Sequence, residues 1–331
     1  MHSQPNHPTP RSDDRSFPTL NASYNHVFQP NRLSVGLVVP LESYRGGPVP
    51  TMKRHLERAQ LAESLGLSAL WLRDVPFNVP SFGDAGQLFD PWVYLGFLAA
   101  QTQRIALGVA SLILPLRHPA HVAKAAATVD QLSGGRLLLG IASGDRPVEY
   151  PAMDIPFDAR GERFRASVDY IRQMGTDWPA FEGRFGRLSG IDMLPKPTAA
   201  RIPLLITGGS QQHPDWIARN GDGWMTYPRP PAAQAKVIRD WRQRVQAAGR
   251  SPRPVMQPLY IDLLEDPDAP PAPIHLGFRA GSRFLRAYLA NLEDIGINHV
   301  ALNLRFSEGD VEQELRRLAE DVLPDRLNGR R

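Results

Sequence analysis

The feature that most constrains the fold is a repeated order in which a short apolar run is followed by a segment with helical spacing. In the first pair, an apolar run over residues 33–41 precedes a helical pattern over residues 52–65 that ends at Gly66. Eight such pairs follow one another from Leu33 onward. Continuous apolar strands that alternate with helices are typical of a parallel sheet buried on both faces.

The strands are predicted at residues 33–41, 69–74, 105–115, 137–143, 202–207, 223–227, 255–263 and 299–304. The helices are predicted at residues 52–65, 91–101, 119–132, 162–174, 214–220, 232–248, 277–295 and 311–322. Eight units in about 300 residues favour a closed (β/α)8 TIM barrel formed by a single α/β domain over residues 33–331. A doubly wound sheet with a second, smaller domain is the alternative fold.

Composition limits the class of protein. Residues 1–32 are rich in Pro, Asn, Ser and His and contain no apolar stretch, so we expect a disordered or loosely docked tail and no secretory signal. No run approaches the ~18 apolar residues of a membrane span, and a cytoplasmic protein is expected. The absence of cysteine excludes disulfides, zinc–thiolate sites and thiol catalysis. A net charge of +4 without a basic run argues against a nucleic-acid partner.

Barrel enzymes carry their functional residues at the C-terminal ends of the strands. Asp74 ends the second predicted strand and Tyr227 ends the sixth, so both are expected near the reacting centre. Asp74 has an alternative interpretation as a helix cap or a partner in a loop salt bridge. His118 and His121 have a metal-binding spacing, but no third ligand is evident nearby, and a role at the start of a helix is the expectation.

Two stretches of small residues follow predicted strands. The fourth strand ends in Ala142, Ser143 and Gly144, which leave space for a flat ligand, although a closely packed helix–strand unit would use the same residues. The fifth ends in Thr207, Gly208, Gly209 and Ser210, where backbone N–H groups and the serine hydroxyl could bind a phosphate. A plain strand-to-helix turn is the alternative there, and barrel phosphate sites are more often found after strands seven and eight.

The segment RHPAHVAKAAATVDQLSGGRLLLGIASGD (117–145) resembles the signature region of the luciferase-like monooxygenase family. ALWLRD (69–74), IALGVASLILP (105–115), ITGGS (206–210) and GDGW (221–224) are similar to other strand regions of that family and occur in the same order. The resemblance covers residues 33–325. It implies a TIM-barrel oxidoreductase in which the cofactor carries the chemistry and the protein positions it.

The resemblance also implies roles for individual residues. Ala110 and Ser111 would lie under the ring of a flavin, with a non-proline cis peptide between them, together with Ala142–Gly144. Arg163 would line the cofactor pocket, although a surface helix also explains it. The sequence departs from the family after the second strand, where many relatives carry an acid–base histidine and this chain has Val75-Pro76-Phe77.

The resemblance favours a monooxygenase that uses reduced FMN and O2 on a small organic substrate, with NAD(P)H acting indirectly through a separate flavin reductase. An F420-dependent oxidoreductase that transfers hydride is the first alternative. A flavin-binding protein without catalysis is the second, and the missing histidine supports it. A homodimer is expected, because family members are often dimers or tetramers. The sequence does not identify the substrate.

Overall fold

Eight parallel strands close into a barrel in the computed structural model, which describes residues 16–323. In chain order they are β1 Ser34–Val38, β2 Ala69–Leu72, β3 Ala106–Ile113, β4 Leu137–Ala142, β7 Leu204–Thr207, β8 Gly223–Met225, β9 Val255–Leu263 and β12 His299–Asn303. Each strand pairs with the next, and β12 pairs back with β1 from Ser34 opposite His299 to Leu37 opposite Leu302. The predicted (β/α)8 barrel is confirmed.

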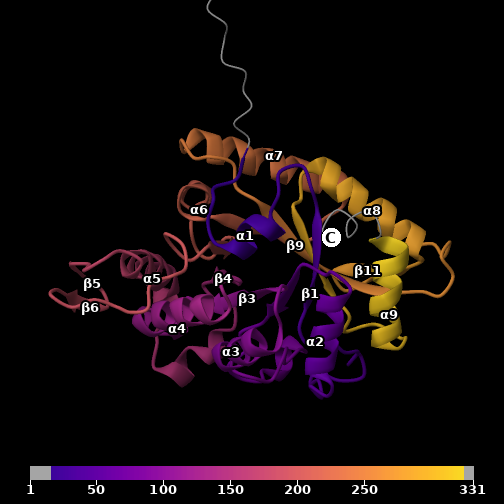
Figure 1. Cartoon of the computed structure of the whole chain (residues 1–331), viewed down its shortest axis with the longest axis horizontal. Coiled ribbons are helices and arrows are strands. Elements are labelled where there is room, and N and C mark those ends of the chain that lie inside the picture. Colours follow the sequence, from indigo (N-terminus) through magenta and orange to yellow (C-terminus); the bar gives the residue numbers. More distant parts are fainter. Residues whose placement is uncertain (1–15, 324–331) are drawn as a thin grey trace, which may run out of the picture.

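Helices surround the barrel (Figure 1). They are α2 His55–Ser64, α3 Pro91–Gln101, α4 Pro119–Leu132, α5 Arg160–Met174, α6 Pro214–Asn220, α7 Pro231–Ala247, α8 Ser282–Ile295 and α9 Val311–Arg317, which continues as a π-helical turn over Leu318–Val322. One apolar cluster fills the space between strands and helices, and a second fills the inside of the barrel. None of the helices in the described chain is long and apolar enough to cross a membrane.

Two hairpins extend the barrel. The strands β5 Phe181–Gly183 and β6 Gly186–Leu188 form a separate hairpin after α5. The strands β10 Ala272–Ile274 and β11 Gly277–Ala280 form another, and β11 also pairs with β9. The expected helix over residues 277–295 is therefore wrong for its first five residues, since α8 begins at Ser282. Gly277 lies against Tyr260, whose carbonyl oxygen would be 1.8 Å from an added Cβ, so glycine permits this strand pairing.

The expected N-terminal tail is wrong for the part that the structure describes. A short helix, α1 Ala22–Val27, lies across the N-terminal end of the barrel (Figure 1). Asn21 caps it and donates from its amide to Asp130 at 2.9 Å, and the buried Tyr24 hydroxyl donates to the carbonyl oxygen of Asp222 at 2.6 Å. Tyr24 and Phe28 pack into the cluster inside the barrel. Residues 1–15 lie outside the described chain.

Candidate functional site

Side chains on a strand alternate between its two faces, and this alternation places the residues at the end of β2. Ala69 and Trp71 belong to the cluster inside the barrel, whereas Leu70 and Leu72 pack beneath the helices. By the same alternation, Arg73 points into the C-terminal mouth of the barrel and Asp74 points outward.

Asp74 does not face the mouth as its expected catalytic role requires. Its carboxylate accepts from both Nη2 and Nε of Arg117, at 2.8 and 3.2 Å, and from the backbone N–H of Ile113 at 3.0 Å. The Asp74 side chain is 1% exposed. The salt-bridge interpretation is the one that this geometry supports, since the carboxylate joins the end of β3 to the start of α4.

A platform of small, half-buried residues does lie at the mouth, on β3, β4 and β7. We use the name platform for Ala110, Ser111, Ala142, Gly144 and Thr207. The register of β3 shifts between Val109 and Leu112, and the Ala110–Ser111 peptide is cis, as the family resemblance predicted. The Ser111 hydroxyl is hydrogen-bonded to the Thr207 hydroxyl, so two strands separated by β4 meet at this point.

The β4 part of the platform is fixed by contacts with Ile113 and Tyr150. Ala142 lies opposite Ile113 in the parallel ladder. The Ser143 side chain is buried, and its carbonyl oxygen accepts a hydrogen bond from the Tyr150 hydroxyl. Gly144 has a φ of +76°, and an added Cβ would lie 2.8 Å from Cγ2 of Ile113. This backbone therefore requires a small residue, and Ala142 and Gly144 remain partly exposed.

The predicted phosphate loop has a different donor set from the one expected. The Gly208 N–H donates to the carbonyl oxygen of Met225 at 2.8 Å, and the Ser210 hydroxyl donates to the carbonyl oxygen of Thr207 at 2.7 Å. Neither proton is free for an anion. The backbone N–H groups of Gly209, Ser210 and Gln211 have no acceptor among the residues that the structure describes. An added Cβ at Gly209 would meet nothing within 4 Å, so the space beside these donors is open.

Two arginines of α5 lie near the mouth, and only Arg165 has a contact next to this loop. Arg163 donates from Nε to the carbonyl oxygen of Pro115 at 3.1 Å and lies 5.2 Å from the ring centroid of Phe185. Burial lowers the pKa of Arg163, and the nearby charge of Arg184 lowers it further. Arg165 donates to the side chain of Gln212 at 3.1 Å. This local excess of positive charge suits an anionic group.

Tyr227 is 48% exposed at the end of β8. Burial of its ring raises the pKa of the Tyr227 hydroxyl, the negative charge of Asp145 raises it further, and the positive charge of Arg73 opposes both. Asp145 is an exposed residue of the loop after β4. The Tyr227 hydroxyl therefore lies near both the Asp145 carboxylate and the Arg73 guanidinium. Of Asp74 and Tyr227, only Tyr227 lies at the mouth, and its catalytic role stays a prediction.

Sequence reasoning missed Glu149, a buried acid in the loop after β4. Its side chain has no exposed surface, and neither carboxylate oxygen has a hydrogen-bond partner among the described residues. Arg146 Nη1 is 3.7 Å from Oε1. Burial raises the pKa of Glu149 to about 7 against the opposing charge of Arg146, and the charges of Asp74 and Asp145 add to the rise. Only its position after a predicted strand could have drawn attention to it.

His118 is the N-cap of α4, where its Nδ1 accepts from the Ala120 N–H at 3.2 Å. Within residues 16–323, no group of three or more His, Asp or Glu side chains is arranged to hold a metal.

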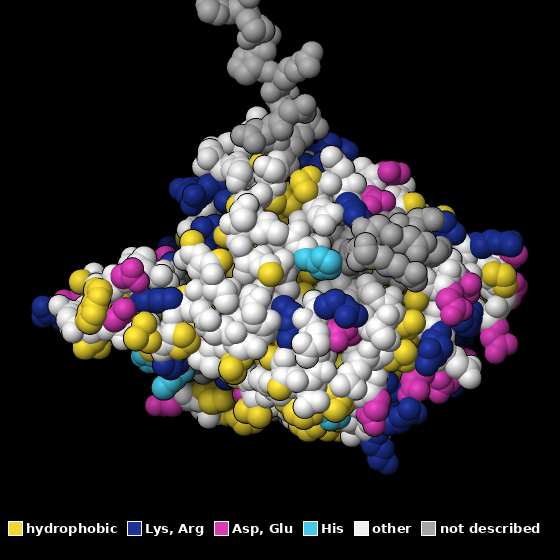
Figure 2. Space-filling view, in the orientation of Figure 1, with side chains coloured by type: hydrophobic (Ala, Val, Ile, Leu, Met, Phe, Trp, Pro, Cys, Tyr) yellow, Lys and Arg dark blue, Asp and Glu magenta, His cyan; other side chains and the backbone are white. Residues whose placement is uncertain are grey.

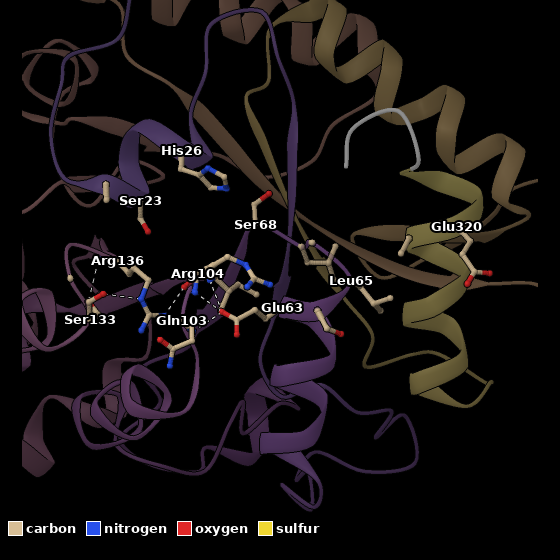
Figure 3. Close-up of a pocket in the computed structure, with 17 residues that line it drawn as sticks. Ser23, His26, Glu63, Leu65, Ser68, Gln103, Arg104, Ser133, Arg136 and Glu320 are labelled. Carbon is tan, nitrogen blue, oxygen red and sulfur yellow. Dashed lines mark hydrogen bonds between the residues drawn. The ribbon is translucent and has the colours of Figure 1, made fainter. Parts of the chain in front are cut away.

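A large cavity of about 1090 Å³ lies at the opposite, N-terminal end of the barrel. Ser23 and His26 of α1 line it, together with Glu63 and Arg136 (Figure 3). Glu63 accepts from three consecutive backbone N–H groups at 2.6–2.9 Å, and every nitrogen of the Arg136 guanidinium donates to a neighbouring oxygen. Both charged groups already form hydrogen bonds within the protein, so the C-terminal mouth is the better candidate for a catalytic site.

Comparison with known proteins gives a family match. The sequence model described as "Luciferase-like monooxygenase" matches residues 26–266. An uncharacterized protein of Mycobacterium tuberculosis is 33% identical over 230 residues, which cover 63% of this chain and 79% of that protein. An F420-dependent hydroxymycolic acid dehydrogenase of the same organism is 29% identical over 228 residues, covering 68% of this chain and 61% of the dehydrogenase.

Solved structures share the fold. A monooxygenase, RslO1 from Streptomyces bottropensis, superposes with a TM-score of 0.72 at 20% identity and covers 88% of this chain and 99% of its own. An F420-dependent secondary alcohol dehydrogenase also has a TM-score of 0.72 at 20% identity, with coverage of 88% and 98%. At this level of identity the likeness concerns the fold.

Proposed function

This chain belongs to the luciferase-like monooxygenase family, and on that premise we propose that it is an oxidoreductase that binds a flavin-type cofactor at the C-terminal mouth. The observation that carries the proposal is the platform, because its small residues leave a flat, half-open surface on otherwise buried strands. The favoured cofactor is reduced FMN, with O2 as co-substrate and a small organic substrate. The reduced FMN would come from a separate NAD(P)H-dependent reductase in the cytoplasm.

The residues fit such a group. The platform would support the ring, and the free N–H groups of Gly209, Ser210 and Gln211 would bind the phosphate, with Arg165 supplying positive charge beside them and Arg163 lining the pocket nearer Pro115. When bound, reduced flavin supplies the electrons for oxygen activation.

The chain's own residues would orient the substrate and move protons. Tyr227 and Asp145 would be the groups that exchange a proton with a substrate, because both lie at the mouth and are exposed. The segment 75–87 would exclude water from one side. It is tied down by Asp84, whose carbonyl oxygen accepts from Arg146 at 3.2 Å, while Arg146 lies 4.8 Å from the ring centroid of Phe82.

Oxygen consumption tests the favoured function. Purified protein would be supplied with reduced FMN by a flavin reductase and screened against small organic compounds under isotopically labelled O2. The expected result is a product that contains one labelled oxygen atom, formed in proportion to the O2 consumed. Uncoupled peroxide with every compound would favour flavin binding without catalysis.

Hydride transfer with F420 is a second candidate, because positive charge extends beyond the phosphate loop. F420 carries an acidic tail in addition to its phosphate, and three further arginines lie away from the loop: Arg160 over Phe157, Arg163 over Phe185, and Arg184, which pairs with Glu162 at 3.5 Å. The named F420-dependent relative also supports it. The test is the anaerobic reduction of F420 by secondary alcohols, measured as the decrease in the absorbance of oxidised F420. Turnover without O2 would assign the chain to this branch.

A homodimer is proposed through α3. Val93 and Phe97 on this helix are 74% and 40% exposed, and hydrophobic side chains gather along the lower edge of the molecule in Figure 2. The helix has no charged residue, so two copies could meet there without repulsion. Light scattering of the wild type should give the mass of a dimer, and Val93→Glu should give that of a monomer. Equal masses would reject this interface.

A further inference from the structure

Arg73 is a cation at the mouth whose hydrogen-bonding capacity is mostly unused. Its Nη1 lies 2.5 Å from Oδ2 of Asp84, which is its one side-chain hydrogen-bond partner among the described residues. Nε and Nη2 donate to no described residue, and the side chain is 23% exposed. A guanidinium presents its donors in a fixed planar fork that matches a carboxylate, so these free donors indicate a ligand.

Asp84 does not neutralise this charge, because it is shared. The same oxygen of Asp84 pairs with Nη1 of Arg305 at 3.1 Å, and Oδ1 accepts from the Tyr44 hydroxyl at 3.0 Å and the Gly86 N–H at 2.9 Å. Two guanidinium groups therefore share one carboxylate. Asp262, on the same face of β9 as Tyr260, is paired with Arg279 at 2.6 Å, and Asp145 lies on the opposite side near Tyr227. Arg73, Arg305 and Asp84 together therefore carry one positive charge in excess.

Aromatic rings lie beside Arg305, and we call Tyr44, Tyr260, His275 and Phe306 the aromatic wall. The Tyr260 ring centroid is 5.3 Å from that of Phe306 and 5.5 Å from that of His275. The Arg305 guanidinium lies 4.9 Å from the ring centroid of Tyr44. Arg73 lies close to the wall, because its Nη1 and the Tyr44 hydroxyl bind the two oxygens of the same carboxylate, that of Asp84. Tyr44 and Tyr260 are buried, so the accessible ring surface belongs mainly to Phe306 and His275, and it favours a planar apolar body next to the free fork.

Arg73 and the aromatic wall lie on the half of the barrel that does not carry the platform. The platform residues come from β3, β4 and β7, whereas Arg73 follows β2, Tyr260 is on β9, and Arg305 follows β12. Because β2 pairs with β3, Arg73 borders the platform, while β9 and β12 continue the closed sheet away from it. A cofactor on the platform would leave Arg73 and the wall facing its exposed side, where a substrate would lie.

We propose that the substrate is a small carboxylic acid with a planar apolar body, whose carboxylate pairs with Arg73 and whose body packs on the aromatic wall. That the ligand is a substrate rests on the proposed function. That the mouth binds a carboxylate follows from Arg73 and its neighbours alone.

Benzoate and its neutral counterpart benzamide are suitable probes. Their affinities would be measured by the absorbance change of bound FMN or F420 and, independently, by thermal shift of the apoprotein. We expect the wild type to bind benzoate about tenfold or more tightly than benzamide, with the preference falling as salt increases. Arg73→Gln should abolish the preference. Arg239→Gln, which removes an equal charge from an exposed position on α7, should retain it.

The possible results distinguish a failure of the proposed carboxylate site from a failure of the cofactor assignment. Equal affinities in the wild type, or a preference that survives Arg73→Gln, would overturn the proposal. A loss of cofactor affinity in Arg73→Gln with the benzoate preference intact would also overturn it, because Arg73 would then serve the cofactor. A benzoate preference in an apoprotein that binds neither cofactor would uphold the anion site and reject the proposed function. The melting temperature of Arg73→Gln shows whether the variant folds, and Arg73→Lys, which keeps the charge without the fork, should restore part of the preference.

Discussion

Asp74 and Arg117 form a bidentate ion pair, in which Oδ1 accepts from Nη2 at 2.8 Å and Oδ2 accepts from Nε at 3.2 Å. The carboxylate also holds the Ile113 N–H at the end of β3. This acid therefore supports the platform from behind and does not act on a substrate directly.

Asp74→Asn should destabilise the protein by about 2–3 kcal/mol, because it leaves the partly buried Arg117 with only the longer contact to Asp90, whose Oδ2 is 3.6 Å from Nη2. Chemical denaturation measures the loss. Asp177→Asn, at an exposed position, should change stability by less than about 0.5 kcal/mol. If Asp74→Asn were as stable as the wild type while losing all turnover, the carboxylate would be catalytic and our interpretation would be wrong.

Gly209→Ala should separate binding from folding. Its added methyl group meets nothing within 4 Å in the protein but would enter the space beside the free N–H groups. We expect an unchanged melting temperature and cofactor affinity reduced about tenfold or more, as measured by titration.

Gly140→Ala is the contrasting variant. Its Cβ would lie 2.2 Å from the carbonyl oxygen of Val109 and 2.5 Å from Cε of Met225, inside the barrel. We expect it to destabilise the fold by about 1–3 kcal/mol. Gly183→Ala, in the open β5–β6 hairpin, serves as the control and should alter neither property. Full cofactor affinity in Gly209→Ala would place the phosphate elsewhere.

Glu149 should make stability depend on pH. Burial raises its pKa from 4.5 to about 7, so the native state holds a proton that the unfolded state releases. The native state therefore loses stability relative to the unfolded state as pH rises from 4.5 to about 7, and the loss is complete above that range. Glu149→Gln removes this effect. The variant should gain more melting temperature over the wild type at about pH 8 than at about pH 5.

Glu57→Gln is the matched control, because Glu57 is exposed on α2. It should show no such difference between the two pH values. A Glu149→Gln variant whose melting temperature differs from the wild type by the same amount at both would show that Glu149 is ionised throughout.

Tyr24 tests the role of α1. Tyr24→Phe keeps the buried ring but loses the hydrogen bond to Asp222, at a cost of about 1 kcal/mol. Tyr24→Ala also leaves a cavity at the end of the barrel and should cost about 3–5 kcal/mol. Denaturant unfolding of each variant measures these losses in stability. An alanine variant as stable as the wild type would mean that α1 contributes nothing to the fold.

Helix boundaries were predictable where the sequence carries a start signal. The predicted and observed bounds agree for α3, α4 and α6, each of which begins at a proline. Tertiary contacts decided the elements that were missed. α1 is a short helix in a polar, proline-rich stretch and is held by Asn21 and Tyr24, and β11 forms because Gly277 can lie against Tyr260. Neither contact is visible in a local pattern.

The site was predictable in position but not in detail. Strands of a parallel barrel are buried on both faces, so ALWL gives no alternation that would show which of Arg73 and Asp74 faces the mouth. Likewise, ITGGS predicts a turn rich in donors, but the sequence does not show that the Gly208 N–H and the Ser210 hydroxyl are already used within the fold.

Binding of FMN and of F420 to the purified apoprotein tests the central claim most directly, by fluorescence quenching and by thermal shift. The account predicts that one of them binds with a dissociation constant in the micromolar range or below and that Gly209→Ala weakens this binding. FMN would point to the oxygenase branch and F420 to hydride transfer. If neither binds at high micromolar concentration, the cofactor assignment is contradicted and the barrel alone remains.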